Sequence, residues 1–226
     1  MSQSDPVVFL HVPKCAGTSI AAAISQALGE SNCYEYGKTA PYKAFESSAY
    51  GLDKYKFIAG HLTISQIELI RGSKKIFTVV RDPIDRVLSW YEFVRRNKRT
   101  TLYPWTEKGD VHSFIERCCE VRRGAVVSRP MEVNSTELFN GMCSRLHPAA
   151  TAEAALGMIE KHNILVLQQS KIDSDVKQIQ TWLDLPELQL PRLNVAPAKR
   201  PYPKSVVERI RELNAEDILL YEKLLK

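Results

Sequence analysis

The chain has 226 residues, enough for one domain with a substantial core or for two small ones. Its hydrophobic fraction of 44%, charged fraction of 25% and formal net charge of +5 are those of an ordinary soluble globular protein and identify no particular partner. The five cysteines contain no C-x-x-C pair and no segment is apolar for long enough to form a signal peptide or a membrane span, which argues against a disulfide framework, a zinc site or a membrane protein and predicts a cytoplasmic location.

The first half of the chain alternates between strand and helix patterns. In chain order these patterns predict a strand over residues 7–12, a helix over 18–28, an irregular segment over 29–54, a strand over 56–60, a helix over 63–70 and a strand over 74–80. A capping box formed by Thr63 and Gln66 marks the start of the second helix. Asp82 as N-cap and Pro83 as first residue predict a further helix directly after the last of these strands.

The second half begins with a basic, turn-rich segment. After it the patterns predict helices over residues 111–120 and 149–161, a strand over 163–169, a helix over 173–183, an extended proline-rich loop and one final helix. Ser205 and Glu208 have the spacing of a capping box, which would start that final helix.

Strands that alternate with helices and read as continuous apolar runs predict an α/β fold with a central parallel sheet covered on both faces. No repeat or linker interrupts the pattern, so we predict a single domain over residues 1–226. Ligands of such sheets bind beyond the carboxyl ends of the strands, where segments 13–19, 60–61 and 81–89 fall.

The segment that follows the first predicted strand has the composition of an anion-binding loop. Gly17 allows a ligand to approach the backbone, and Thr18 and Ser19 lie at a helix start, where free N–H groups and hydroxyls attract negative charge. Lys14 adds an ammonium group. The loop is not a Walker A motif, because its lysine precedes the glycine instead of the Ser/Thr, which argues against an ordinary ATP–Mg²⁺ site.

This stretch, HVPKCAGTS at residues 11–19, resembles the 5′-phosphosulfate-binding loop of sulfotransferases that use 3′-phosphoadenosine 5′-phosphosulfate (PAPS). It resembles in particular the carbohydrate branch with the heparan sulfate 2-O- and 6-O-sulfotransferases and their bacterial relatives. The resemblance implies a P-loop-like three-layer fold shared with nucleotide kinases. It also implies that the phosphosulfate is held by Lys14, Cys15, Ala16, Gly17, Thr18 and Ser19.

The segment FTVVRDPIDRVLSWY, residues 77–91, resembles the 3′-phosphate-binding segment of the same family. Arg81 follows a strand end and can donate two N–H groups to a phosphate, and Ser89 can add its hydroxyl. The family also closes a basic loop over the nucleotide, which implies contacts from Lys199 and Arg200; an ordinary solvated loop is the alternative.

Other segments leave their roles open. Arg86 either serves the site or pairs with Asp82 or Asp85 to hold the segment. The stretch DILLY, residues 217–221, resembles a terminal family pattern, and FNGMCSRL, residues 139–146, loosely resembles a segment near the acceptor. Further basic clusters are either solvated faces or the rim of an anionic acceptor site; they comprise Arg95, Arg96, Lys98, Arg99, Arg122 and Arg123.

Transfer to an alcohol needs a base, and an imidazole has a suitable reference pKa. His61 follows a predicted strand and precedes a helix N-terminus, which favours its neutral form, and it resembles the histidine base of the glycan sulfotransferases. The alternatives are that His61 is a capping or core-edge residue, or that His11 takes the role.

The sequence therefore predicts a PAPS-dependent sulfotransferase that moves a sulfuryl group in line to a hydroxyl acceptor, with His61 and Lys14 as catalytic residues. A carbohydrate or small glycoconjugate is the expected acceptor, and no metal, nucleic acid or membrane span is expected. Two alternatives remain: an atypical P-loop small-molecule kinase, and a non-catalytic module that binds PAP, the bisphosphate product of PAPS, or RNA.

Overall fold

The computed structural model describes residues 5–36, 51–107, 109–122, 137–191, 193 and 201–226. The chain divides into two compact units, one of residues 1–81 and 142–193 and the other of residues 82–141 and 194–226. We describe each unit by itself. The single domain over residues 1–226 stays a prediction, because a compact unit need not fold alone.

The first unit contains a five-stranded sheet. Its strands are β1 (Val7–Leu10), β2 (Cys33–Glu35), β3 (Phe57–Gly60), β4 (Lys75–Val80) and β5 (Leu165–Gln168). They follow the spatial order β2-β3-β1-β4-β5, and every neighbouring pair is parallel. The predicted α/β class with a parallel sheet is confirmed. Strand β2 lies within the segment 29–54, which the sequence analysis predicts to be irregular. The sequence did not reveal this strand, because three residues are too few to show an alternating pattern.

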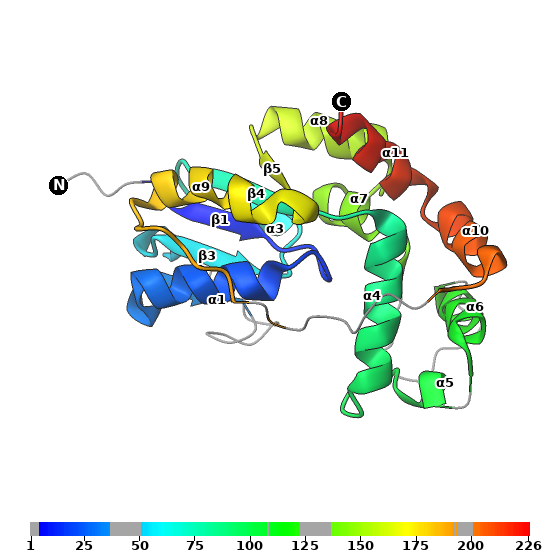
Figure 1. Ribbon diagram of the computed structural model, residues 1–226. Helices are drawn as coiled ribbons and strands as arrows, with labels where there is room; N and C mark the ends of the chain where they lie inside the picture. The colour runs from blue at the N-terminus through cyan, green and yellow to red at the C-terminus, as the bar shows by residue number, and fades with distance from the viewer. Residues whose placement is uncertain (1–4, 37–50, 108, 123–136, 192, 194–200) are drawn as a thin grey trace. The chain divides into compact units, whose positions relative to one another are not determined.

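The helices of this unit are α1 (Gly17–Leu28), α3 (Ile64–Glu68), α7 (Gly141–Leu146, whose first residue falls in the second unit), α8 (Ala152–Lys161) and α9 (Ile172–Leu183). Short 3₁₀ turns cover Glu30–Asn32, Leu52–Lys54 and Gln169–Lys171. Figure 1 shows α1 and α9 on opposite faces of the sheet. This arrangement confirms the predicted three-layer fold.

Strand β1 is the centre of the unit, and all four of its residues are fully buried. The ring of Phe9 stacks on that of Phe77 in β4, with 4.5 Å between centroids. In register, Leu10 lies opposite Gly60 of β3 on one side and Thr78 of β4 on the other. The loops that follow β1, β3 and β4 therefore leave the sheet at the same edge, as parallel pairing requires.

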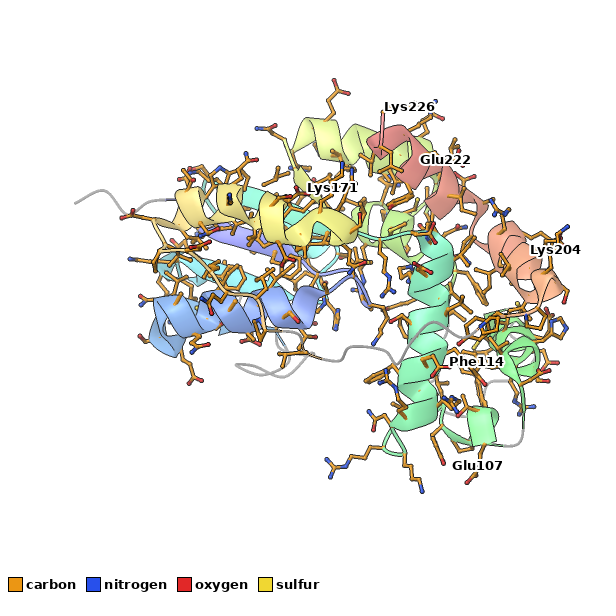
Figure 2. The ribbon with its side chains drawn as sticks, viewed as in Figure 1. Glu107, Phe114, Lys171, Lys204, Glu222 and Lys226 are labelled. Carbon is orange, nitrogen blue, oxygen red and sulfur yellow. The ribbon has the colours of Figure 1, made fainter. Side chains whose placement is uncertain are left out.

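The second unit is helical. Its helices are α4 (Pro83–Arg96), α5 (Pro104–Glu107), α6 (Val111–Arg122), α10 (Lys204–Leu213) and α11 (Ala215–Leu224). Buried apolar side chains of α4, α6 and α10 form its core. Figure 2 labels Phe114 of α6 within this core; its ring centroid lies 5.4 Å from that of Tyr91 of α4.

Arg86 is the largest fully buried side chain of the described residues, and it has a structural role with an acidic partner other than the two predicted. It pairs with Asp217 at 3.4 Å and not with Asp82 or Asp85. Its two terminal nitrogens also donate to the main-chain oxygens of Glu137 and Leu138. Arg86 is thus a structural residue of the second unit, because the side chain projects into the helical core.

Gly141 is required beside the Arg86 guanidinium. A Cβ atom at position 141 would lie 2.7 Å from Nη1 of Arg86, closer than real Cβ contacts allow. Any side chain at 141 would therefore displace the arginine from its buried partners.

The signals that predict the starts of helices α3 and α4 are confirmed. The Thr63 hydroxyl accepts from the Gln66 main-chain N–H, and the Gln66 side chain accepts from the Thr63 N–H, so the capping box is complete. The Asp82 carboxylate accepts from the Asp85 N–H at 2.9 Å, and Pro83 is the first residue of α4.

Two predictions for the C-terminal region are wrong. Helix α10 begins at Lys204, so Ser205 lies inside it and caps nothing; Pro203 precedes the helix with an extended ψ of 142°. The single final helix is two helices that meet at Asn214. The Asn214 amide oxygen is buried and accepts from the Asn140 N–H at 3.0 Å, which breaks the helical run.

None of the helices in the described part of the chain is both long and apolar enough to cross a bilayer. The cytoplasmic location stays a prediction.

Candidate active site

The loop between β1 and α1 has an unusual backbone. Lys14 and Ala16 adopt left-handed φ values of 69° and 63°, and Ala16 is the N-cap of α1. Such conformations cost about 1–2 kcal/mol for a residue with a Cβ atom. Left-handed residues in alternation with right-handed ones turn successive N–H groups toward one concavity, which suits an anion. The local strain is thus the kind that anion-binding loops carry.

Gly17, the first residue of α1, allows the ring of His11 to approach the backbone. A Cβ atom at position 17 would lie 2.0 Å from Cδ2 and from Nε2 of His11. The φ angle of Gly17 is not positive, so close approach and not conformational freedom requires the glycine. His11 packs against the helix start from within the protein.

His61 lies in the short link between β3 and α3. Its Nδ1 atom is 3.1 Å from the main-chain oxygen of His11. A carbonyl oxygen only accepts, so Nδ1 carries the proton and Nε2 carries the lone pair. This bond selects the tautomer in which the outer nitrogen can accept a proton.

The two histidine rings lie side by side, with 4.3 Å between centroids and 32° between planes. Burial lowers the pKa of His11 well below its usual value, and the positive charge that His61, Arg145 and Lys14 carry or can carry lowers it further. His11 is therefore neutral at pH 7. The neutral His11 ring thus packs against the ring of His61, close to the loop between β1 and α1.

Arg81 connects the end of β4 to the anion loop. Its Nη1 atom donates to the main-chain oxygen of Lys14 at 3.1 Å. Its Nε atom is buried and has no hydrogen-bond partner among the described residues. A buried guanidinium N–H without an acceptor is costly, so this N–H is a candidate donor to a bound ligand.

The other loop residues contribute in different ways. Thr18 is exposed at the start of α1, whereas Cys15 is buried and donates its thiol weakly to the Pro13 oxygen. The Ser19 hydroxyl accepts from the Leu193 N–H at 3.3 Å, which leaves the hydroxyl proton available for donation.

The predicted residues are only partly assembled in one described site. The structure brings together Lys14, Gly17, His61 and Arg81 in the first unit. Ser89 lies partly buried in α4 of the second unit. The predicted contacts from Lys199 and Arg200 lie outside the described residues.

One residue beside the site escaped the sequence analysis. Arg145 of α7 donates from Nη1 to the main-chain oxygen of His61. The only signal in the sequence was an arginine within the otherwise apolar and small stretch FNGMCSRL. An arginine in a short helix does not reveal which carbonyl it reaches.

Among the described residues no group of three histidine, cysteine or acidic side chains is placed to hold a metal ion.

Comparison with known proteins identifies the class. The model of the sulfotransferase family matches residues 1–223, so this chain belongs to the sulfotransferase family. No curated protein matches the chain. A solved sulfotransferase from Alicyclobacillus acidocaldarius has the same fold, with a TM-score of 0.57 and 16% identity over 98% of this chain and 96% of that one.

Two larger solved proteins are more distant. Mouse sulfotransferase SULT7A1, complexed with PAP, has a TM-score of 0.46 and 16% identity over 95% of this chain and 66% of that one. Retinol dehydratase, in complex with androsterone and the inactive cofactor PAP, has a TM-score of 0.41 and 15% identity over 94% of this chain and 65% of that one. The chain spans about two thirds of the length of these two proteins.

Proposed function

We propose that this protein transfers a sulfuryl group from PAPS to a hydroxyl acceptor, with His61 as the general base. The observation that carries this proposal is the bond from His61 Nδ1–H to the His11 oxygen. It leaves Nε2 as the accepting nitrogen, on a strand end adjacent to the anion loop. Membership of the sulfotransferase family supports the same chemistry.

The residues present fit the two anionic ends of the nucleotide. The left-handed turn at Lys14 and Ala16 suits the phosphosulfate, with the Lys14 ammonium and the exposed Thr18 hydroxyl as additional donors. The orphaned Nε atom of Arg81 suits the 3′-phosphate. By resemblance we assign Ser89, Lys199 and Arg200 to the same end, and Cys15, Gly17 and Ser19 to the loop.

PAPS supplies an activated sulfuryl group. As the acceptor oxygen bonds to sulfur and the bond from sulfur to the bridging phosphate oxygen breaks, the acceptor proton passes to His61 Nε2 and PAP leaves. Lys14 and the loop N–H groups stabilise the charge that develops on the leaving oxygen. General-base assistance of this kind contributes about 10²–10⁴-fold to a rate.

We assign the acceptor to the carbohydrates or small glycoconjugates. This assignment rests on the resemblance of HVPKCAGTS and of the Gly60–His61 segment to the carbohydrate branch. A screen with radiolabelled PAPS against mono- and oligosaccharides, phenols and steroids tests it. Label in a sugar supports the assignment, and label only in a phenol or a steroid contradicts it.

The function is tested by comparing His61→Asn with wild type. The asparagine Nδ2–H can replace the His61 Nδ1–H bond to His11, but it offers no base in place of Nε2. We expect unchanged PAP affinity and a loss of transfer of about 10²-fold or more. His112→Asn, at an exposed position in α6, is the matched control and retains wild-type transfer.

Calorimetry separates the proposed function from its rivals. PAP binding without Mg²⁺ supports the proposal, whereas Mg²⁺-dependent ATP binding with phosphate transfer identifies a kinase. PAP or RNA binding with no PAPS consumed against any acceptor identifies a binding module. If His61→Asn transfers the sulfuryl group at the wild-type rate, His61 is not the base.

A further inference from the structure

Arg145 contacts the main chain of His61, the proposed base. It extends from the last turn of α7, and only 8% of it is exposed. Its Nη1 donates to the main-chain oxygen of His61. Figure 1 draws α7 near the edge of the sheet at which β1 and β3 end, consistent with this contact.

The bond from Arg145 is one of several that define the His61 link. The ring is held by its donation to His11, and the residue after it, Leu62, is fully buried. The capping box at Thr63 fixes the start of α3 just beyond. The main-chain oxygen of His61 is held from α7, an element more than 80 residues later in the chain. This contact sets the peptide plane from which the ring projects.

Positively charged groups act on His11 in the histidine pair. Within the described part of the chain, the charges of His61, Arg145 and Lys14 act on His11 and lower its pKa. Adding a proton to either ring would place a third positive charge among them, which is unfavourable in a partly desolvated site. Arg145 therefore favours the uncharged imidazoles that a base requires.

We propose that Arg145 is a positioning residue for the base: it holds the His61 main chain so that the ring keeps the Nδ1–H tautomer, in which Nε2 carries the lone pair. The proposal rests on the proposed function for its catalytic consequence. The effect of Arg145 on the tautomer of the His61 ring is structural and does not depend on the proposed function. Arg145 itself touches neither the acceptor nor the nucleotide in this account.

Three variants separate the contact from the charge. Arg145→Ala removes both, Arg145→Gln keeps a donor without the charge, and Arg145→Lys keeps a charge and one donor. Arg211→Ala, at an exposed position in α10, is the control for loss of an arginine. Circular dichroism shows which variants fold, and the glutamine and lysine variants retain a test should the alanine variant unfold.

Four quantities are measured for each protein: the affinity for PAP, kcat for formation of the sulfated acceptor, the pH profile of kcat, and the ¹⁵N chemical shifts of the His61 ring. For Arg145→Ala we expect PAP affinity near that of wild type and kcat about 10²-fold lower, because small displacements of a reacting group cost about that much. The His61 ring changes from the Nδ1–H tautomer to a mixture. Arg145→Lys restores part of kcat, and Arg145→Gln shifts the acid limb of the profile to higher pH.

Each contrary result has a definite meaning. Wild-type kcat and an unchanged tautomer in Arg145→Ala overturn the proposal, as does an equal loss in all three variants with no change in tautomer. A loss of PAP affinity that matches the loss of kcat makes Arg145 a nucleotide-site residue instead. If the wild type transfers no sulfuryl group, the proposed function fails, and the ring shifts still decide whether Arg145 sets the His61 tautomer.

Discussion

The side chains of Arg86 and Asp217 form an ion pair of 3.4 Å in which neither partner has any exposed surface. The pair joins the first turns of α4 and α11, which are separated by 131 residues in the chain. Both residues come from stretches that resemble family motifs, RDPIDR and DILLY. In this protein Arg86 and Asp217 pair with each other within the helical unit. The predicted partners of Arg86, Asp82 and Asp85, do not form this ion pair.

We expect Asp217→Asn and Arg86→Met to lower the free energy of unfolding by about 3–5 kcal/mol each, because removing one partner leaves a buried charge or its hydrogen-bonding groups uncompensated. Urea unfolding measures the change. The double variant Arg86→Met/Asp217→Asn should lose less than the sum of the single losses. Strictly additive losses would show that the two side chains do not interact.

Gly17→Ala should weaken PAP binding and lower the free energy of unfolding by about 1–3 kcal/mol, because the new methyl group meets the His11 ring. Calorimetry with PAP and urea unfolding measure the two effects. The double variant Gly17→Ala/His11→Ala should recover most of the stability, since His11 keeps its main-chain oxygen for His61. No recovery would mean that another contact requires the glycine.

Arg81→Met should weaken PAP binding by about 10- to 10²-fold, the loss of a charge-assisted hydrogen bond of about 1.5–3 kcal/mol. Adenosine 5′-phosphosulfate, which lacks the 3′-phosphate, should lose much less affinity. The comparison controls for the lost bond to the Lys14 oxygen, which affects both ligands. Equal losses for the two nucleotides would remove Arg81 from the 3′-phosphate site.

The stability of the wild type should fall below about pH 6.5 in part because of His11. Burial, with the neighbouring positive charge, lowers the pKa of His11 in the folded state, so the unfolded chain takes up its proton first. The contribution of His11 is thus fully present above its unfolded pKa and is lost as the pH falls toward its folded pKa.

Urea unfolding at several pH values measures this effect. Between about pH 6.5 and 5, His11→Ala should have a slope of unfolding free energy against pH that is smaller by up to about 1.4 kcal/mol per pH unit. His112→Ala, at an exposed position, is the control. The same slope in wild type and His11→Ala would show that His11 titrates normally.

Local signals accounted for the elements around the site. The apolar run before His11, the capping box at Thr63 and the Asp82–Pro83 start of α4 each depend on residues within a few positions of one another, so the sequence sufficed to predict them. The local signal at Ser205 was misleading, because the chain through Pro203 starts the helix earlier. The break at Asn214 depends on a side-chain bond to Asn140, 74 residues away in sequence.

By itself the sequence determined the alternation of strands and helices, the lysine-containing loop and the candidate base His61, because these follow from short-range periodicity, turn residues and motif spacing. Only the tertiary structure decided that His61 donates to His11, that Arg145 holds the His61 main chain and that Arg86 pairs with Asp217. Each of these contacts joins residues at least 50 positions apart, and partners at that distance are selected by parallel register and core packing, which no local pattern encodes.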